Sequence, residues 1–166
     1  FFIFSCHQDL KQDDSATAII DEASYCEQLG FSESIFATES ESARMGNLVS
    51  DFTIETTEGS WSFSESWTGC DSFMFFNYHP DYEYSVAIWD SSIEDLLTSS
   101  PLNVHYFFTS FNQGSEETDV TALQDRFDQE LLSIDENLRE HWKSHVHFVT
   151  ESIGTAESLG DLLQYR

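Results

Sequence analysis

Positively charged residues are scarce in this chain of 166 residues. It has 6 Lys and Arg against 31 Asp and Glu, which gives a formal net charge of −25. Such a surface repels DNA, RNA and anionic lipid, and it attracts cations and basic partners. The composition therefore argues against nucleic-acid binding. It predicts the solvated surface of a secreted protein or of a marine, salt-adapted bacterium, and an acidic module that binds cations is the alternative.

Cysteine is also rare, and the three thiols, Cys6, Cys26 and Cys70, form no C-x-x-C pair. This spacing excludes a zinc ribbon and a C-x-x-C redox dithiol. Three cysteines allow at most one intramolecular disulfide, and Cys26 and Cys70 are the candidate pair in an oxidising compartment. The alternative is that both remain unpaired thiols.

Hydrophobic runs long enough to cross a membrane are missing, so we expect no transmembrane helix. The apolar start at residues 1–6 ends on Cys6 and resembles the end of a bacterial export signal for lipoproteins. In this interpretation Cys6 is lipidated and anchors the protein to a membrane surface. The alternative is that these residues form an ordinary buried β-strand.

Residues 7–45 are rich in Ser, Glu, Asp and Ala, and parts of them are close to low complexity. Segments of this composition bury little apolar surface. We therefore interpret residues 7–45 as an acidic extension or tether, with residues 46–166 as the folded domain.

Strand signals recur through residues 46–166. Apolar and polar residues alternate at 52–55 and again at 61–63, on either side of a Thr-Thr-Glu-Gly turn, which predicts a β-hairpin. Continuous apolar runs at 73–78 and 104–110 predict two central strands that are covered on both faces. A third strand is expected at 146–149.

Helices are predicted between and after these strands. Ser91-x-x-Glu94 is a capping box that begins a short helix, and Pro101 ends it. A long helix follows with an apolar stripe at spacings of three and four, and Thr155 caps a last helix. The stripe consists of Val120, Leu123, Phe127, Leu131, Ile134, Leu138 and Trp142. Strands that alternate with helices predict parallel pairing in an α/β sandwich.

Several segments resemble the redoxins of the thioredoxin-like superfamily, the alkyl hydroperoxide reductase and thiol-disulfide oxidoreductase type. Residues 46–54, Gly-Asn-Leu-Val-Ser-Asp-Phe-Thr-Ile, are similar to the family's Gly-Asp entry and Pro-Asp-Phe-Thr-Leu strand. Residues 58–65, Glu-Gly-Ser-Trp-Ser-Phe-Ser-Glu, are similar to its Asp-Gly-Lys-x-Val-x-Leu-Ser turn and strand. The runs at 73–78 and 104–110 resemble its next two strands. The resemblance implies a thioredoxin-like α/β sandwich with an N-terminal β-hairpin.

The resemblance also implies where the family's chemistry lies, in the loop after Tyr78, which carries a C-x-x-C pair or a peroxidatic cysteine. Here residues 79–84 read His-Pro-Asp-Tyr-Glu-Tyr and hold no thiol, while Cys70, the redox candidate, precedes the strand. The family's closing cis-proline hairpin and last helix would follow Arg166. We therefore expect a C-terminally incomplete domain without the active-site cysteines and without a cofactor.

Two further sets of polar residues are candidates for sites. His79, Asp81 and Glu83 are the acid–base candidates in the loop, with a surface turn as the alternative. His141, His145 and His147 are the metal candidates, with solvated histidines at a helix end as the alternative. The first two are spaced i, i+4 on a helix, whereas the last two would share a face only on a strand. Neither set resembles a phosphate loop, a G-x-S-x-G elbow or an H-E-x-x-H motif.

These features predict a non-catalytic thioredoxin-like module of a larger bacterial protein outside the cytoplasm, periplasmic, cell-surface or secreted. It would serve as a scaffold or bind a protein partner or a downstream domain of the same chain. The rival prediction is a redoxin-like thiol oxidoreductase or peroxidase that uses Cys70. The third is the acidic cation-binding module.

Overall fold

The computed structural model describes residues 25–36 and 51–151. Three strands form a parallel sheet in the order β3 (Ser72–Tyr78), β4 (Val104–Ser110) and β5 (Val146–Phe148). The fold is therefore mixed α/β with a parallel sheet. This confirms the predicted fold class and the alternation of strands and helices.

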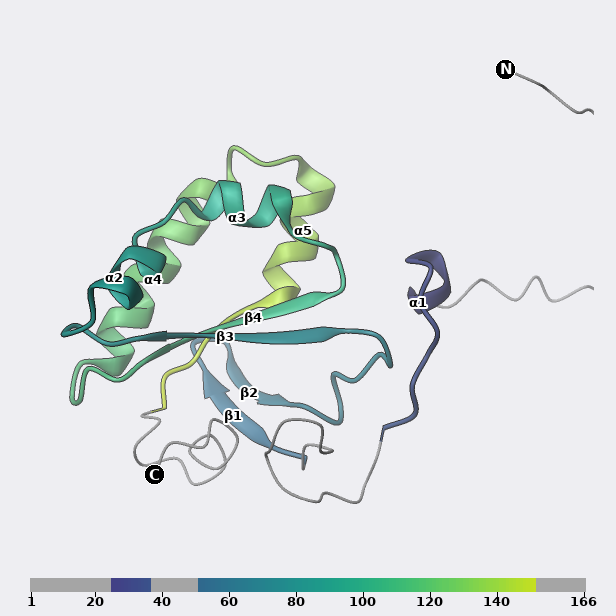
Figure 1. The fold of residues 1–166 in the computed structure, drawn as a ribbon, viewed down its shortest axis with the longest axis horizontal. Helices are drawn as coiled ribbons and strands as arrows, with labels where there is room; N and C mark the ends of the chain where they lie inside the picture. Colours follow the sequence, from purple (N-terminus) through teal and green to yellow (C-terminus); the bar gives the residue numbers. More distant parts are fainter. Residues whose placement is uncertain (1–24, 37–50, 152–166) are drawn as a thin grey trace, which may run out of the picture.

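Four helices lie in the two connections of this sheet. The first connection contains α2 (Glu83–Trp89) and α3 (Ile93–Ser99), and the second contains α4 (Glu116–Leu131) and α5 (Glu136–His145). Figure 1 shows all four on one side of the sheet. This arrangement follows from the strand order, because successive right-handed crossovers that advance in one direction place their helices on the same face.

A β-hairpin covers the other face of the sheet. Its strands are β1 (Thr53–Thr56) and β2 (Gly59–Ser62), which pair antiparallel. The end of β1 is joined to the chain after β5, where Thr57 N donates to Phe148 O at 2.9 Å and Thr150 N donates to Glu55 O at 3.0 Å. The predicted hairpin is confirmed, and these bonds attach it to the sheet.

The central strand β4 separates two apolar cores. All seven of its residues are buried, and their side chains alternate between the two faces. Tyr106 and Phe108 pack into the cluster under the helices, with Trp142 and Phe148. On the other face the cluster contains Phe52, Ile54, Phe63, Phe107 and Val149, mostly from the hairpin side. A polar residue on either face of β4 is therefore placed inside the molecule.

The long helix predicted from one apolar stripe is wrong, because the structure breaks it into α4 and α5. The break lies at 132–135, where Asp135 becomes the N-cap of α5 and its side chain accepts from Asn137 N. Arg139 donates to the backbone carbonyls of Leu131, Leu132 and Ile134, which satisfies the end of α4. The stripe continues across the break because both helices pack on the same face of the sheet.

The first connection also differs from the prediction. The N-cap of α3 is Ser92, whose side chain accepts from Asp95 N at 3.1 Å, so the predicted capping box is displaced by one residue. The helix α2, before it, was not predicted. Its one buried aromatic residue is Trp89, since the other described residues of α2 are exposed or half-buried except for Ser85.

The strand β3 was expected to be central, but it lies at the edge of the described sheet. It pairs with β4 over its whole length, from Ser72 opposite Val104 to Tyr78 opposite Ser110. Within residues 25–36 and 51–151, no second strand pairs with its outer side. The predicted cover on both faces is also only partial, because the residues of β3 are half-buried or exposed, whereas all of β4 is buried. A continuous apolar run does not report the number of neighbouring strands.

Part of the predicted extension packs against the domain. It contains the four-residue helix α1 (Tyr25–Gln28), in which Cys26 is buried and joined to Cys70 by a disulfide with 5.8 Å between the two Cα atoms. Ser34 N donates to Gly69 O, and the Trp67 indole donates to Ser34 O.

Other predictions fall on residues that the structure does not describe. These are the signal-like segment with Cys6, most of the extension, the start of the domain at Gly46 and the last helix after Thr155. Among the described helices, none has the length and apolar character that a membrane crossing requires.

Candidate functional site

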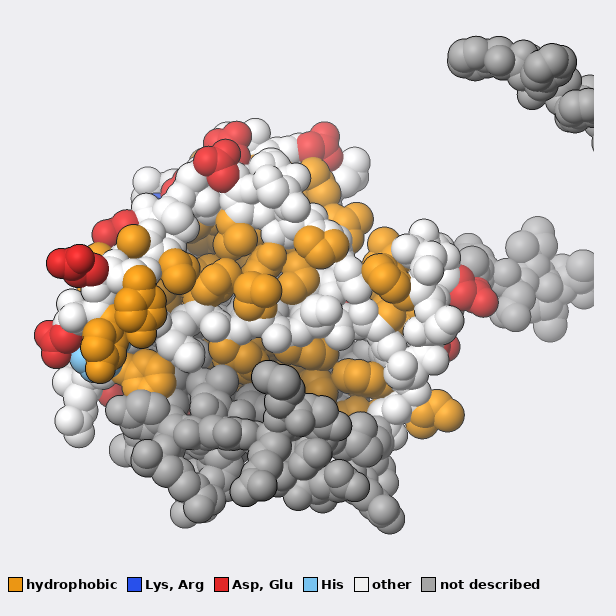
Figure 2. All heavy atoms as spheres, in the orientation of Figure 1, with side chains coloured by type: hydrophobic (Ala, Val, Ile, Leu, Met, Phe, Trp, Pro, Cys, Tyr) orange, Lys and Arg blue, Asp and Glu red, His pale blue; other side chains and the backbone are white. Residues whose placement is uncertain are grey.

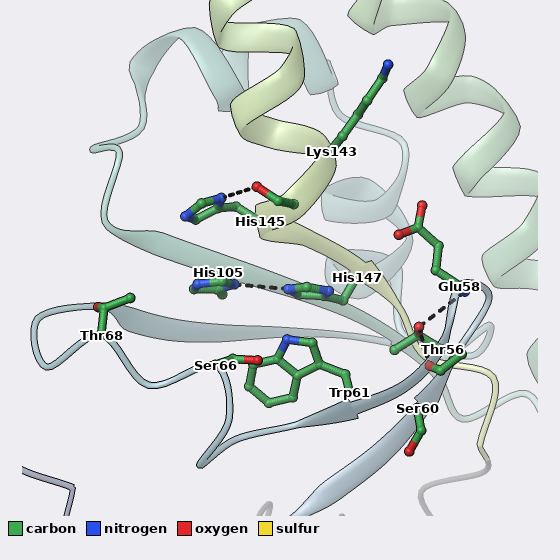
Figure 3. Close-up of a pocket in the computed structure, with 12 residues that line it drawn as sticks. Thr56, Glu58, Ser60, Trp61, Ser66, Thr68, His105, Lys143, His145 and His147 are labelled. Carbon is green, nitrogen blue, oxygen red and sulfur yellow. Dashed lines mark hydrogen bonds between the residues drawn. The ribbon is translucent and has the colours of Figure 1, made fainter. Parts of the chain in front are cut away.

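A pocket of about 460 Å³ opens between the hairpin and the end of α5. Trp61 of β2 forms one wall, and His105 of β4 and His147 of β5 form the floor beside it (Figure 3). The pocket is also lined by the charged residues Lys143 and Glu58 and by the hydroxyl-bearing residues Thr56, Ser60, Ser66, Thr68 and Ser144. The pocket is therefore lined by both polar and aromatic side chains.

Two histidines on neighbouring strands form the centre of this site. The Nδ1 atom of His105 lies 3.0 Å from the Nε2 atom of His147, and the two rings are nearly coplanar, with an interplanar angle of 9°. On its other side, His105 Nε2 lies 3.4 Å from Asp71 Oδ2. The Asp71 side chain is completely buried, and Thr68 Oγ1 donates to the same oxygen at 2.7 Å.

The contacts of Asp71 with His105 and of His105 with His147 indicate the direction of the hydrogen bonds. A carboxylate can only accept, and the contact with Asp71 Oδ2 fits a His105 ring that donates from Nε2 and carries a lone pair on Nδ1. His147 must then donate from Nε2, which leaves its own Nδ1 as an acceptor. The arrangement Asp71–His105–His147 therefore orients a histidine that lines the pocket.

Two more histidines stack on this pair. The His145 ring lies 4.3 Å from the His105 ring, and the His141 ring lies 3.9 Å from the His145 ring, measured between centroids. The i, i+4 spacing of His141 and His145 brings them together because α5 continues to His145. Their ring nitrogens lie 2.9 Å from backbone oxygens, His141 Nε2 from Leu102 O and His145 Nδ1 from His141 O.

All four histidines are held in the neutral form near neutral pH. Burial and then the neighbouring His145 lower the pKa of His105 to about 4, against the opposing effect of Asp71. Burial and then His105 lower the pKa of His147 to about 3. Burial also lowers the pKa values of His141 and His145.

These pKa values limit what the site does chemically. A general acid or base is most effective when its pKa lies near the working pH, so His105 and His147 are poorly suited to proton transfer at neutral pH. Among the described residues, no group of three or more His, Cys, Asp or Glu side chains is arranged to hold a metal ion. Of the predicted metal candidates, His147 bonds to His105, while His145 stacks on both His105 and His141. The neutral histidines are best suited to accept hydrogen bonds from a polar group of a ligand and to donate hydrogen bonds to it.

The predicted acid–base set in the loop after β3 forms a turn. His79 Nδ1 accepts from the backbone N of Asp81, and Ser85 Oγ donates to His79 O at 2.7 Å. The His79 ring packs on Tyr82, with 4.4 Å between centroids, and Glu83 begins α2. In the described part of the chain, the His79 side chain bonds to the backbone of Asp81 and packs on Tyr82, and it does not bond to the carboxylates of Asp81 or Glu83.

The redox candidate Cys70 lies at the opposite end of β3 from that loop. It precedes the strand at Ser72, and its partner in the disulfide, Cys26, is fully buried. Asn103 donates to the backbone O of Cys70 at 2.8 Å, which attaches this loop to the residue before β4.

Sequence reasoning did not identify Asp71, His105 or Trp61 as site residues. One signal was available, because His105 is the one histidine in the buried apolar run 104–110. A polar group in a strand that is covered on both faces needs a partner. The partner Asp71 lies 34 positions earlier, and its proximity depends on the register of β3 against β4.

Comparison of the chain with family models, with curated proteins and with solved structures found no match.

Proposed function

We propose that this chain is a non-catalytic binding module with a thioredoxin-like fold that works outside the bacterial cytoplasm. The support for the fold is the order of its elements, a hairpin followed by alternating strands and helices, together with the redoxin-like segments at 46–54 and 58–65. The support for the location is the disulfide between Cys26 and Cys70, since disulfides persist in oxidising compartments.

One observation carries the proposal that the module is not an enzyme. In parallel sheets, reactive groups gather at the carboxyl ends of the strands. At that end of β3 the chain has the turn from His79 to Glu83 and no thiol, whereas Cys70 lies at the amino end. The lowered pKa values of His105 and His147 also make the pocket poorly suited to acid–base catalysis near neutrality.

Redox assays on the full chain test this proposal. We expect no reduction of insulin in the presence of dithiothreitol and no consumption of hydrogen peroxide above the buffer rate. The Cys70→Ser variant should behave in the same way as the unsubstituted chain. Clear turnover that disappears in Cys70→Ser would overturn the proposal in favour of the thiol enzyme.

A further inference from the structure

The outer edge of β3 leaves backbone groups unpaired within the described part of the chain. Ser72 N donates to Asn103 O, and Tyr78 O accepts from Phe111 N, both at 2.8 Å, so these two residues face β4. Residues of a strand point their backbone groups to alternate sides. The N–H and C=O groups of Phe73, Phe75 and Asn77 therefore point away from β4, toward the open side.

This edge lacks the features that protect exposed strands. Natural proteins cover such edges or place Lys, Pro or a bulge on them. The strand β3 reads Ser-Phe-Met-Phe-Phe-Asn-Tyr, without a charge or a proline, and pairs with β4 without a bulge. Met74 is 48% exposed. The backbone of the segment 25–36 bonds to the domain at Gly69, before β3, and makes no backbone hydrogen bond to β3 itself.

An apolar pocket of about 130 Å³ lies beside this edge on the helix-covered face. It is lined by Phe76 of β3, Phe108 of β4, and Ile88, Trp89, Ile93 and Leu96 from the connection between them. A cavity of about 150 Å³ holds a benzene ring, so this pocket has room for one aliphatic side chain. A strand added to β3 would direct every second side chain toward this face.

Charge indicates which kind of partner fits. Figure 2 shows hydrophobic side chains over β3 and the helices above it, with carboxylates along the margin of this band. Asp81, Glu83, Asp90 and Glu94 are exposed on α2, α3 and the turn before them. The one Lys or Arg that lines the pocket, Arg126, is paired with Asp90 and Glu130. A second copy of the chain would bring a further net charge of −25 and be repelled.

We propose that the outer edge of β3 binds an extended segment of a partner protein as an added strand, with an apolar side chain in the adjoining pocket and Lys or Arg on its flanks. Backbone hydrogen bonds supply affinity in this mode, and the pocket and the flanking charges supply specificity. The inference deepens the proposed function and rests on the chain being a binding module.

The probe is a set of synthetic peptides of about ten residues, the usual upper length of a strand. Each alternates apolar and polar residues around a central Leu, Ile, Val or Phe and carries two lysines at each end. We expect at least one to bind the full chain in fluorescence anisotropy. Hydrogen exchange should then slow at the amides of Phe73, Phe75 and Asn77. Methylation of alternate peptide nitrogens, or exchange of the lysines for glutamates, should abolish binding.

Two variants of the chain locate the site, and one matched variant controls for charge. Met74→Lys on the edge and Ile88→Lys at the pocket should each weaken binding by about tenfold or more, as expected when one contact of 1.4 kcal/mol is lost. Leu132→Lys adds the same charge at an exposed apolar residue in the turn after α4 and should leave binding within about twofold.

Several results would overturn the inference. They are the failure of every peptide to protect the three amides, undiminished binding of the methylated peptide, and equal weakening in Leu132→Lys. Concentration-dependent dimerisation that Met74→Lys abolishes would assign the edge to a second copy instead. Because binding is measured without redox reagents, peptide binding with Cys70-dependent turnover would overturn only the proposed function. Absent binding without turnover would overturn only the inference about the edge.

Discussion

His147 is a single residue whose surroundings predict how the stability of the protein changes with pH. Its folded pKa of about 3 lies below the ordinary value of 6.5, so between these values the unfolded chain binds the proton that the folded chain excludes. Stability from this group is therefore fully present above pH 7 and is lost as the pH falls from about 6.5 toward 3. By linkage, the loss at pH 5 is about 2 kcal/mol.

The substitution His147→Gln should remove this contribution. The difference in unfolding free energy between pH 7 and pH 5, measured in urea, should be about 2 kcal/mol smaller in His147→Gln than in the unsubstituted chain. His105 and His145 lie next to His147, Asp71 and His141 lie behind them, and all four remain in the variant. Thr121→Ala, an exposed change on α4 that removes no titratable group, should reproduce the original pH dependence. Identical pH dependence in all three proteins would contradict the prediction.

The histidine site shows which contacts between single residues can be predicted from the sequence. The spacing of His141 and His145 predicted their proximity on a helix, and the structure confirms it. The bond between His105 and His147 joins two strands that are 42 residues apart in sequence, and no local pattern encodes such a contact. The participation of Asp71 depends on the same strand register.

At the scale of elements, Gly69 determines how the segment 25–36 packs on the domain. Its φ is +96°, and an added Cβ would lie 2.9 Å from both the backbone N and the backbone O of Ser34. Gly59 also has a positive φ, +112°, but an added Cβ would meet nothing within 4 Å. The two glycines therefore form a matched pair that separates backbone strain from close packing.

We expect Gly59→Ala to cost about 1–2 kcal/mol of unfolding free energy, because an L-residue is strained in the left-handed region. Gly69→Ala should cost a further ~1–3 kcal/mol, since the added Cβ would clash with backbone atoms of Ser34, which cannot rotate away. Urea unfolding measures both values. The indole of Trp67, which donates to Ser34 O, should become more exposed to acrylamide quenching in Gly69→Ala alone. Equal losses in the two variants would show that the contact with Ser34 contributes nothing.

The elements themselves were predictable to different degrees. Alternation and apolar runs located all five strands of the described domain to within a few residues, because they report which faces are buried. The break between α4 and α5 was not predictable from the stripe, since the apolar spacing continues from Leu131 through Ile134 to Leu138. At the end of α4 the guanidinium of Arg139, which lies on the next helix, donates to the backbone carbonyls, and the apolar spacing does not encode this contact. The edge position of β3 is likewise a property of the sheet and not of the strand.

At the scale of the whole molecule, the net charge of −25 is the dominant electrostatic feature. Of the six Lys and Arg residues in the chain, the described part contains Arg126, Arg139 and Lys143, and the first and last of these are in ion pairs. Most carboxylates therefore repel one another in the folded state. Compactness increases that repulsion relative to the unfolded chain.

Salt should stabilise the fold by screening this repulsion. The Debye length falls from about 30 Å at 10 mM salt to about 3 Å at 1 M, so the unfolding free energy in urea should rise over this range. NaCl and KCl should act equally, and Asp125→Asn/Asp128→Asn on the exposed face of α4 should show a shallower rise because it carries two fewer charges. An unfolding free energy that does not change with salt would contradict the prediction. A gain that is specific to Ca²⁺ at constant ionic strength would instead favour a module that binds cations, because screening does not distinguish ions at the same ionic strength.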